Sequence, residues 1–122
     1  MRNYRFWLAA VFLTVAFPVD AGEWITMAVT PRQAFSPTNL TVRVTVQPNA
    51  DNRTLQVVAD SQDFYRSSQI QLDGEAGPRS VTVEFRAVPS GNYDVTGVLR
   101  DGAGQPRALA RQQAVVLSSG GR

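Results

Sequence analysis

The 122-residue chain contains no histidine, no cysteine and no lysine. Without histidine or cysteine, neither a Ser/His/Asp nor a Cys/His catalytic relay can be assembled. Zinc and copper also lose their usual ligands. The lack of cysteine excludes a disulfide, so core packing alone must stabilise the fold. We therefore expect a protein that is not an enzyme and that holds no metal and no cofactor.

The charged residues are nearly balanced, since twelve arginines oppose ten acidic residues and the formal net charge is +2. A nucleic-acid partner requires a concentrated basic face, so we expect none. The acidic residues show no spacing typical of the paired carboxylates of a glycosidase. Most of them lie in or beside turns, where aspartate caps backbone amides. Such turns could also offer oxygen ligands to calcium, but no patterned Asp-x-Asp run occurs.

The first residues have the pattern of a secretory signal peptide. Arg2 and Arg5 precede an apolar run from Phe6 to Phe17. Val19 and Ala21 are small residues that a signal peptidase accepts, so we expect cleavage after Ala21. The alternative is an uncleaved anchor helix, but about a dozen apolar residues are fewer than the roughly 20 that span a bilayer.

These features predict three segments and a compartment. Residues 1–21 would be the signal peptide, residues 22–117 a single domain of ordinary size, and residues 118–122 a flexible tail. We expect the mature chain to be secreted or periplasmic, with no membrane span once the leader is removed.

From residue 24 onward, apolar side chains recur at every second position. The segment from Leu40 to Gln47 alternates without interruption and places Val42, Val44 and Val46 on one face. This pattern is typical of a half-buried strand, and β-branched residues favour it. Similar segments, separated by turn-forming residues, lie at 25–29, 55–59, 70–72, 80–87, 92–99 and 107–117. Seven such strands predict an all-β, seven-stranded antiparallel sandwich.

Three segments break the simple pattern. The connection from Pro31 to Pro37 lacks two amide donors, so it should run along an edge or leave the sheet. The segment 107–117 has two competing periods, which a bulge near Gln112 would reconcile. Gly97 is expected to mark a bulge or a close backbone approach. The first and last strands are the expected edges, where another chain could add a strand.

The segment from Val88 to Val95 reads Val-Pro-Ser-Gly-Asn-Tyr-Asp-Val. It resembles the segment that enters strand F in fibronectin type III and related immunoglobulin-like domains. The resemblance implies that Pro89 and Gly91 lead into Tyr93, whose hydroxyl bonds back to the chain upstream. It also implies an immunoglobulin-like sandwich. Such domains host adhesion, docking and spacer roles, and the fold alone selects none of them.

The best candidate binding surface is Phe64, Tyr65 and Arg66, because aromatic residues and arginine are enriched at interaction hot spots. In the competing interpretation, Phe64 plugs the open end of the sandwich and Tyr65 packs on its rim. Trp24 and Phe35 raise the same question. Trp24 lies opposite the apolar face of the first strand, so it is either a surface contact or a lid over an edge.

The sequence predicts an exported interaction or structural module that docks to another protein of an envelope or extracellular assembly. The alternative is a carbohydrate- or small-ligand-binding module that uses Phe64, Tyr65 and Trp24 as stacking platforms. Two Asn-x-Thr sequons begin at Asn39 and Asn52, and they matter only in a pathway that glycosylates.

Overall fold

The computed structural model describes residues 24–118, so the predicted signal peptide and the tail beyond Ser118 lie outside the described residues. Over residues 24–118 the chain forms eight β-strands and one short 3-10 turn. No helix in this part of the chain is long and apolar enough to cross a membrane. The elements are β1 (Ile25–Thr30), β2 (Gln33–Phe35), β3 (Thr38–Val46), β4 (Thr54–Asp60), β5 (Tyr65–Gln71), η2 (Gly74–Ala76), β6 (Ser80–Val88), β7 (Gly91–Arg100) and β8 (Pro106–Leu117).

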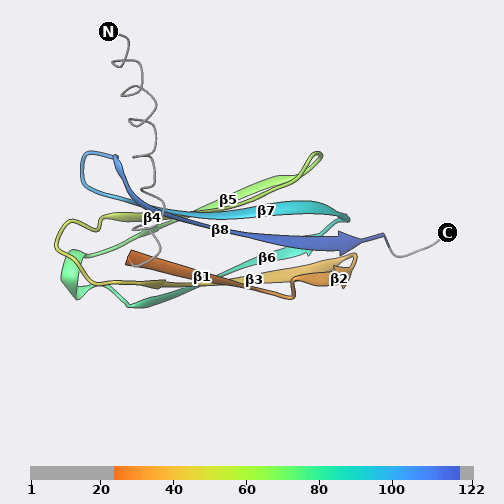
Figure 1. The fold of residues 1–122 in the computed structure, drawn as a ribbon, viewed down its shortest axis with the longest axis horizontal. Helices are drawn as coiled ribbons and strands as arrows, with labels where there is room; N and C mark the ends of the chain where they lie inside the picture. Colours follow the sequence, from red (N-terminus) through yellow and green to blue (C-terminus); the bar gives the residue numbers. More distant parts are fainter. Residues whose placement is uncertain (1–23, 119–122) are drawn as a thin grey trace, which may run out of the picture.

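The strands form two sheets packed as layers (Figure 1). One sheet has three strands in the order β1-β3-β6, and the other has five in the order β2-β8-β7-β4-β5. The fold is therefore all-β, as expected. The prediction of seven antiparallel strands was wrong in detail, because the described residues form eight strands and β2 pairs with β8 in parallel.

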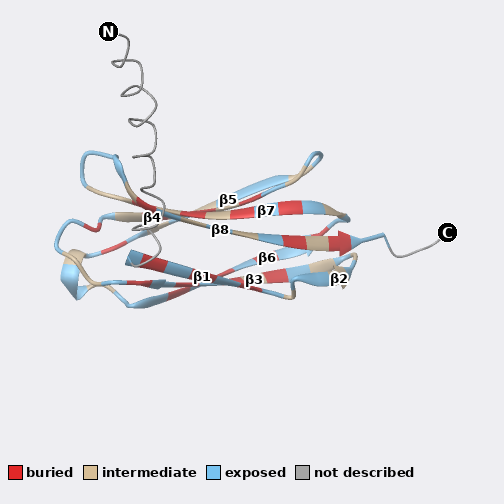
Figure 2. Cartoon of the chain, in the orientation of Figure 1, coloured by how far each residue is buried: buried red, intermediate tan, exposed pale blue. Residues whose placement is uncertain are grey.

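The core lies between the two layers, and buried residues alternate with exposed ones along the strands (Figure 2). In β3, Leu40, Val42 and Val44 are fully buried, while Arg43 and Thr45 are exposed. The same alternation holds in β1, β4, β6 and β7. Period-two patterning therefore decides which side of each strand faces the core.

The extra strand β2 lies in the proline-bounded connection. After Thr30 the chain leaves the three-stranded sheet and pairs with the end of β8, with Gln33 opposite Val115 and Phe35 opposite Leu117. Proline cannot donate to a ladder, so the pairing lies within the five residues between the two prolines, where Arg32 and Ser36 also exchange backbone hydrogen bonds with β8. The connection thus leaves one sheet and runs along the edge of the other.

The predicted bulge near Gln112 is absent. β8 pairs with β7 in one register from Ala108 to Val116, and the only shift between the two strands is at Arg107, opposite Leu99 and Arg100. Ala108, Ala114 and Val116 are buried on the inner face, while Leu109 lies on the outer face and is 47% exposed. The period was ambiguous because apolar residues occupy both faces of β8.

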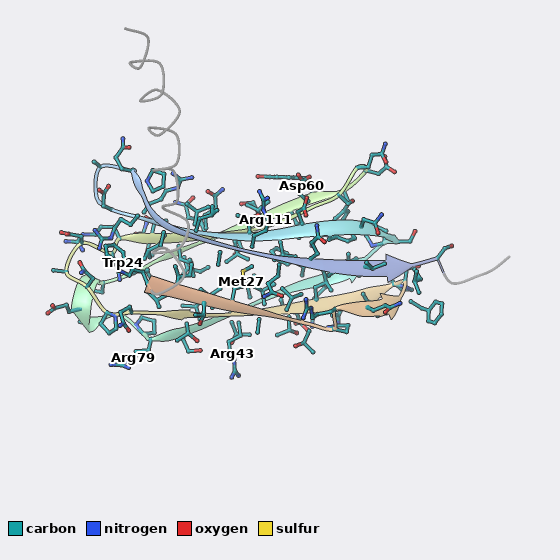
Figure 3. The ribbon with its side chains drawn as sticks, viewed as in Figure 1. Trp24, Met27, Arg43, Asp60, Arg79 and Arg111 are labelled. Atoms are coloured by element: carbon teal, nitrogen blue, oxygen red, sulfur yellow. The ribbon has the colours of Figure 1, made fainter. Side chains whose placement is uncertain are left out.

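Gly97 marks a close approach of the two layers. A Cβ at this position would lie 3.4 Å from Sδ of Met27, which projects from β1 in the opposite sheet. Figure 3 shows the Met27 side chain between the layers. Of the two expectations for Gly97, the close backbone approach is confirmed.

The open edges differ in part from those expected. β1 is an edge of its sheet, as predicted, and β6 is the other. β8 was expected to be an edge, but β2 covers its last residues. β5 forms the far edge of the five-stranded sheet.

A bulge near the end of β6 places Ala87 in the left-handed region, with φ of 53°. The register between β3 and β6 shifts between Thr38 and Leu40. The Ala87 N–H donates a hydrogen bond of 3.0 Å to Oδ1 of Asn39. A residue with a Cβ is strained in this conformation by roughly 1–2 kcal/mol.

We expect Val44→Asp to unfold the domain, because Val44 is fully buried and a carboxylate there would have no partner. Circular dichroism should show no cooperative thermal transition. The matched control is Thr45→Asp on the exposed face of the same strand, which should cost about 1 kcal/mol or less. Equal effects of the two variants would contradict the inward assignment of Val44.

We expect Ala87→Gly to stabilise the domain by about 0.5–1 kcal/mol, because glycine adopts the left-handed region without a Cβ penalty. Ala28→Gly is the control, since Ala28 is exposed in the extended strand β1 and its substitution should destabilise by a similar amount. Urea unfolding measures both. A loss of stability in Ala87→Gly would show that the backbone there is not left-handed.

Candidate interaction surface

The residues of the Val88–Val95 segment have a structural role at one end of the sandwich. Tyr93 is 1% exposed, and its hydroxyl donates a hydrogen bond of 2.8 Å to the carbonyl oxygen of Pro89. This is the backward hydrogen bond that the resemblance implies. A Cβ at Gly91 would lie 3.3 Å from Cε2 of Tyr93, so the bare backbone of Gly91 leaves room for the ring. The three residues hold the turn from β6 into β7.

Phe64, Tyr65 and Arg66 do not form one surface. Phe64 is partly buried against the core and makes an edge contact with the Tyr93 ring, at 5.9 Å between centroids. The Arg66 guanidinium lies 5.1 Å from the centroid of the Phe64 ring. Phe64 thus packs at the end of the core, as the competing interpretation expected. Tyr65 does not pack on the rim, because it is 62% exposed on the outer side of β5.

Trp24 lies far along the sandwich from Tyr65, because Figure 3 shows Trp24 well to the left of Asp60, and Asp60 is the strand partner of Tyr65. The Arg107 guanidinium stacks on the Trp24 ring at 4.4 Å and approaches the Asp51 carboxylate at 3.5 Å. Trp24 is 38% exposed. It therefore closes the end of the sandwich where β8 begins, which fits a lid better than a free contact. A single stacking platform built from Phe64, Tyr65 and Trp24 is excluded by this placement.

The outer faces of the two sheets differ in chemistry. Among the described residues, the large hydrophobic side chains that remain exposed are Trp24, Phe35, Tyr65, Leu109 and Leu117. All except Trp24 belong to the five-stranded sheet. Strand register places these four on its outer side, which we call the docking face. Figure 3 shows Asp60 and Arg111 projecting from this side of the molecule, and Arg43 and Arg79 from the other.

The outer face of the three-stranded sheet is polar. Its registered positions are hydroxyl and charged residues with one alanine, namely Thr26, Ala28, Thr30, Thr41, Arg43, Thr45, Ser80, Thr82, Glu84 and Arg86. Glu84 and Arg86 approach each other at 3.5 Å on β6. Threonine suits an exposed pleated surface, and this face needs no partner to cover it.

Sequence reasoning singled out Tyr65 on the docking face but missed Leu109 and Leu117. These two leucines could have been found from segment 107–117, because apolar residues occupy both sets of alternate positions there. We interpreted that pattern as a bulge. Phe35 was noticed, yet its place beside Leu117 depends on the parallel pairing of β2 with β8. No local pattern specifies that pairing.

A hollow of about 320 Å³ lies along β7 and β8, lined by Asn92, Tyr93, Asp94, Gln113, Ala114 and Val115. Gln113 Nε2 donates a hydrogen bond of 3.2 Å to Oδ1 of Asp94. The hollow holds one carboxylate rather than a converging pair. Within residues 24–118, no group of three or more acidic side chains is arranged to hold a metal ion.

The two sequons differ in access. Asn52 is 1% exposed, and its Nδ2 donates to the carbonyl oxygen of Gln47 at 3.0 Å. Its amide nitrogen is therefore inaccessible in the folded domain. Asn39 is exposed, although its Oδ1 accepts the hydrogen bond from Ala87.

No protein-family model matches the chain, and no curated protein matches it. Among solved structures, it is similar to the sulfur carrier protein SoxY from Chlorobium limicola f. thiosulfatophilum, with 12% identity over 91% of this chain and 98% of that one, at a TM-score of 0.54. It is also similar to the E23A superoxide reductase (neelaredoxin) from Ignicoccus hospitalis, with 12% identity over 83% and 86% of the chains and a TM-score of 0.54. A bacterial immunoglobulin-like domain of the M. primoryensis ice-binding adhesin matches at 12% identity over 78% and 95%, with a TM-score of 0.43. At such identities the likeness concerns the fold alone.

We expect Tyr93→Phe to destabilise the domain by about 1 kcal/mol or more, because it leaves the Pro89 carbonyl without its donor. Tyr65→Phe is the control and should change stability by less than about 0.5 kcal/mol, since Tyr65 is exposed. Chemical denaturation followed by circular dichroism measures both. A neutral Tyr93→Phe would contradict a structural role for this hydroxyl.

Proposed function

We propose that this chain is an exported, non-enzymatic interaction module whose docking face binds another protein chain of an envelope or extracellular assembly. One observation carries the proposal. Phe35, Tyr65, Leu109 and Leu117 are large apolar side chains left exposed on the same side of one sheet. Large apolar side chains exposed on one face are typical of interaction sites.

The shape of the docking face supports a protein partner. Small-molecule sites are concave and bury most of the ligand surface. The docking face is instead the outer side of a sheet, and its hollow of about 320 Å³ along β7 and β8 is at the lower end of the size of small-molecule sites. A carbohydrate module would need aromatic platforms that act together. Trp24 instead stacks on Arg107 at the start of β8, Tyr65 lies opposite Asp60 at the end of β4, and Phe64 packs against Tyr93.

The chemistry available also favours binding over catalysis. The chain has no histidine and no cysteine. Asp60 and Asp94 are the nearest approach to a carboxylate pair on the docking face, since they lie opposite each other on β4 and β7. They stand on the open outer side of the sheet, whereas a glycosidase holds its two carboxylates on either side of a bound sugar. Export rests on the leader pattern of residues 1–21.

The proposal predicts that a photo-cross-linking amino acid at position 109 captures a protein in the envelope or extracellular fraction of the native host. The same group at Thr82, on the polar outer face of the three-stranded sheet, should capture none. Mass spectrometry of the adducts measures the difference. Equal labelling at both positions, or none at 109, would contradict the docking face.

A ligand titration separates the alternative function. Glycans added to the purified chain should leave the fluorescence of Trp24 and the tyrosines unchanged. Saturable quenching would favour a carbohydrate-binding module over protein docking.

A further inference from the structure

We propose that the partner of the docking face is a second copy of this chain, bound face to face about a twofold axis that runs across the strands. This inference rests on the proposed function and names its partner. It follows from the order of charged and apolar side chains along β4, β7 and β8.

The docking face has an acidic end. Asp60 and Asp94 lie directly opposite each other on the antiparallel strands β4 and β7. Like charges in this position destabilise a sheet, so a cation brought to them from outside would be stabilising. Gln113 donates to Asp94. Among residues 24–118, neither aspartate takes part in a salt bridge.

The opposite end of the same face is basic. Arg100 follows Asp94 by six positions on β7, and this even spacing keeps both side chains on one side of the strand. The Arg100 guanidinium donates to the carbonyl oxygen of Gly104 at 3.2 Å and to Oε1 of Gln56 at 3.3 Å. Both acceptors are neutral, so the charge of Arg100 stays uncompensated. Asp101 is adjacent, but its Oδ1 accepts from the N–H groups of Ala103 and Gln105 in the hairpin.

Apolar side chains lie between the two ends. Leu109 is opposite Val98 on the neighbouring strand, and Val58 is opposite Thr96. Leu109 is 47% exposed, while Val58 and Val98 are partly buried. Along the strands the face therefore runs from the two aspartates, through a band in which Val58, Val98 and Leu109 lie among polar side chains, to Arg100. Arg111 is exposed opposite Thr96, inside this central band, where its alkyl stem can cover apolar surface.

Two twofold axes in the plane of the sheet can bring this face onto itself. An axis along the strands places Asp60 and Asp94 against the same two residues of the partner, so that four carboxylates meet. An axis across the strands reverses the order and places Asp94 against Arg100 of the partner subunit, with the central bands in contact. The second arrangement keeps the carboxylates apart and pairs Asp94 with Arg100, and its axis lies level with Gly97, midway between positions 94 and 100.

The size of the face sets the strength of the pairing. The contact region lies between the levels of Asp94 and Arg100 and leaves Phe35 and Leu117 outside it. Four strands spaced at about 4.8 Å, each about seven residues long, give it a projected area of roughly 450 Å² per copy. A standard stable interface buries about 800 Å² per partner. The dimer is therefore weak and exchanges with a folded monomer, and salt weakens it because its charges lie near solvent.

Analytical ultracentrifugation of the exported chain over a concentration series tests the inference. The unmodified chain should form dimers that dissociate more readily at high salt. Asp94→Arg and Arg100→Asp should each weaken dimerisation at least tenfold, because each opposes like charges across the axis. Glu84→Arg and Arg43→Asp are matched controls on the outer face of the three-stranded sheet, and they should leave the dimer unchanged.

Mixing the two docking-face variants gives the sharpest readout. A copy carrying Asp94→Arg and a copy carrying Arg100→Asp restore both ion pairs in a mixed dimer, so the mixture should associate where each variant alone does not. The double variant Asp94→Arg/Arg100→Asp should likewise recover the dimer. Thermal unfolding verifies that every variant is folded. No association on mixing, or a chain that stays monomeric at millimolar concentration, overturns the inference.

The cross-linking outcome separates this inference from the proposed function. An adduct of two copies through position 109 supports both. An adduct with a different protein, from a chain that sediments as a monomer, overturns the second-copy partner and leaves the docking face intact. No adduct of either kind overturns both.

Discussion

The continuous apolar core sealed between two sheets is the constraint on which the rest of the structure depends. No cysteine is available to cross-link the layers, so the interlocking of β1, β3 and β6 with β4, β7 and β8 must stabilise the domain alone. Polar groups in this core must find partners. The Tyr93 hydroxyl does so through the Pro89 carbonyl, and the same bond fixes the turn between β6 and β7. Gly97 shows how closely the layers meet, because Met27 from the opposite sheet fills the space of its missing side chain.

Because the inner faces are committed to packing, the outer faces are free to carry function. The two outer faces have taken different forms. One is an array of threonine, serine and paired or solvated charges. The other exposes apolar side chains and leaves an acidic and a basic end without compensating salt bridges among the described residues. This asymmetry is the basis of the proposed docking face.

Much of the fold could be predicted from the sequence. The uninterrupted alternation of β3 and β6 predicted their inward faces correctly. Alternate residues of a pleated strand lie on one side, so the apolar set must face the core. β2 could not be predicted, since a three-residue strand has too few positions to show a period, and its partner is about eighty residues away. β8 was misread because its outer face is apolar as well. Of the docking face, Tyr65 was found by residue type, while Leu109 was not.

The sequence by itself determined the strand class, the direction of each core side chain and the absence of thiol and imidazole chemistry, because these depend on residue identity and local periodicity. Only the tertiary structure decided which side chains meet. It separated Trp24 from Tyr65 and turned Phe64 towards Tyr93. It also placed Asp60 opposite Asp94 on a face shared with Leu109. The physical reason is that strand order and register join residues far apart in the chain, and no local pattern encodes that pairing.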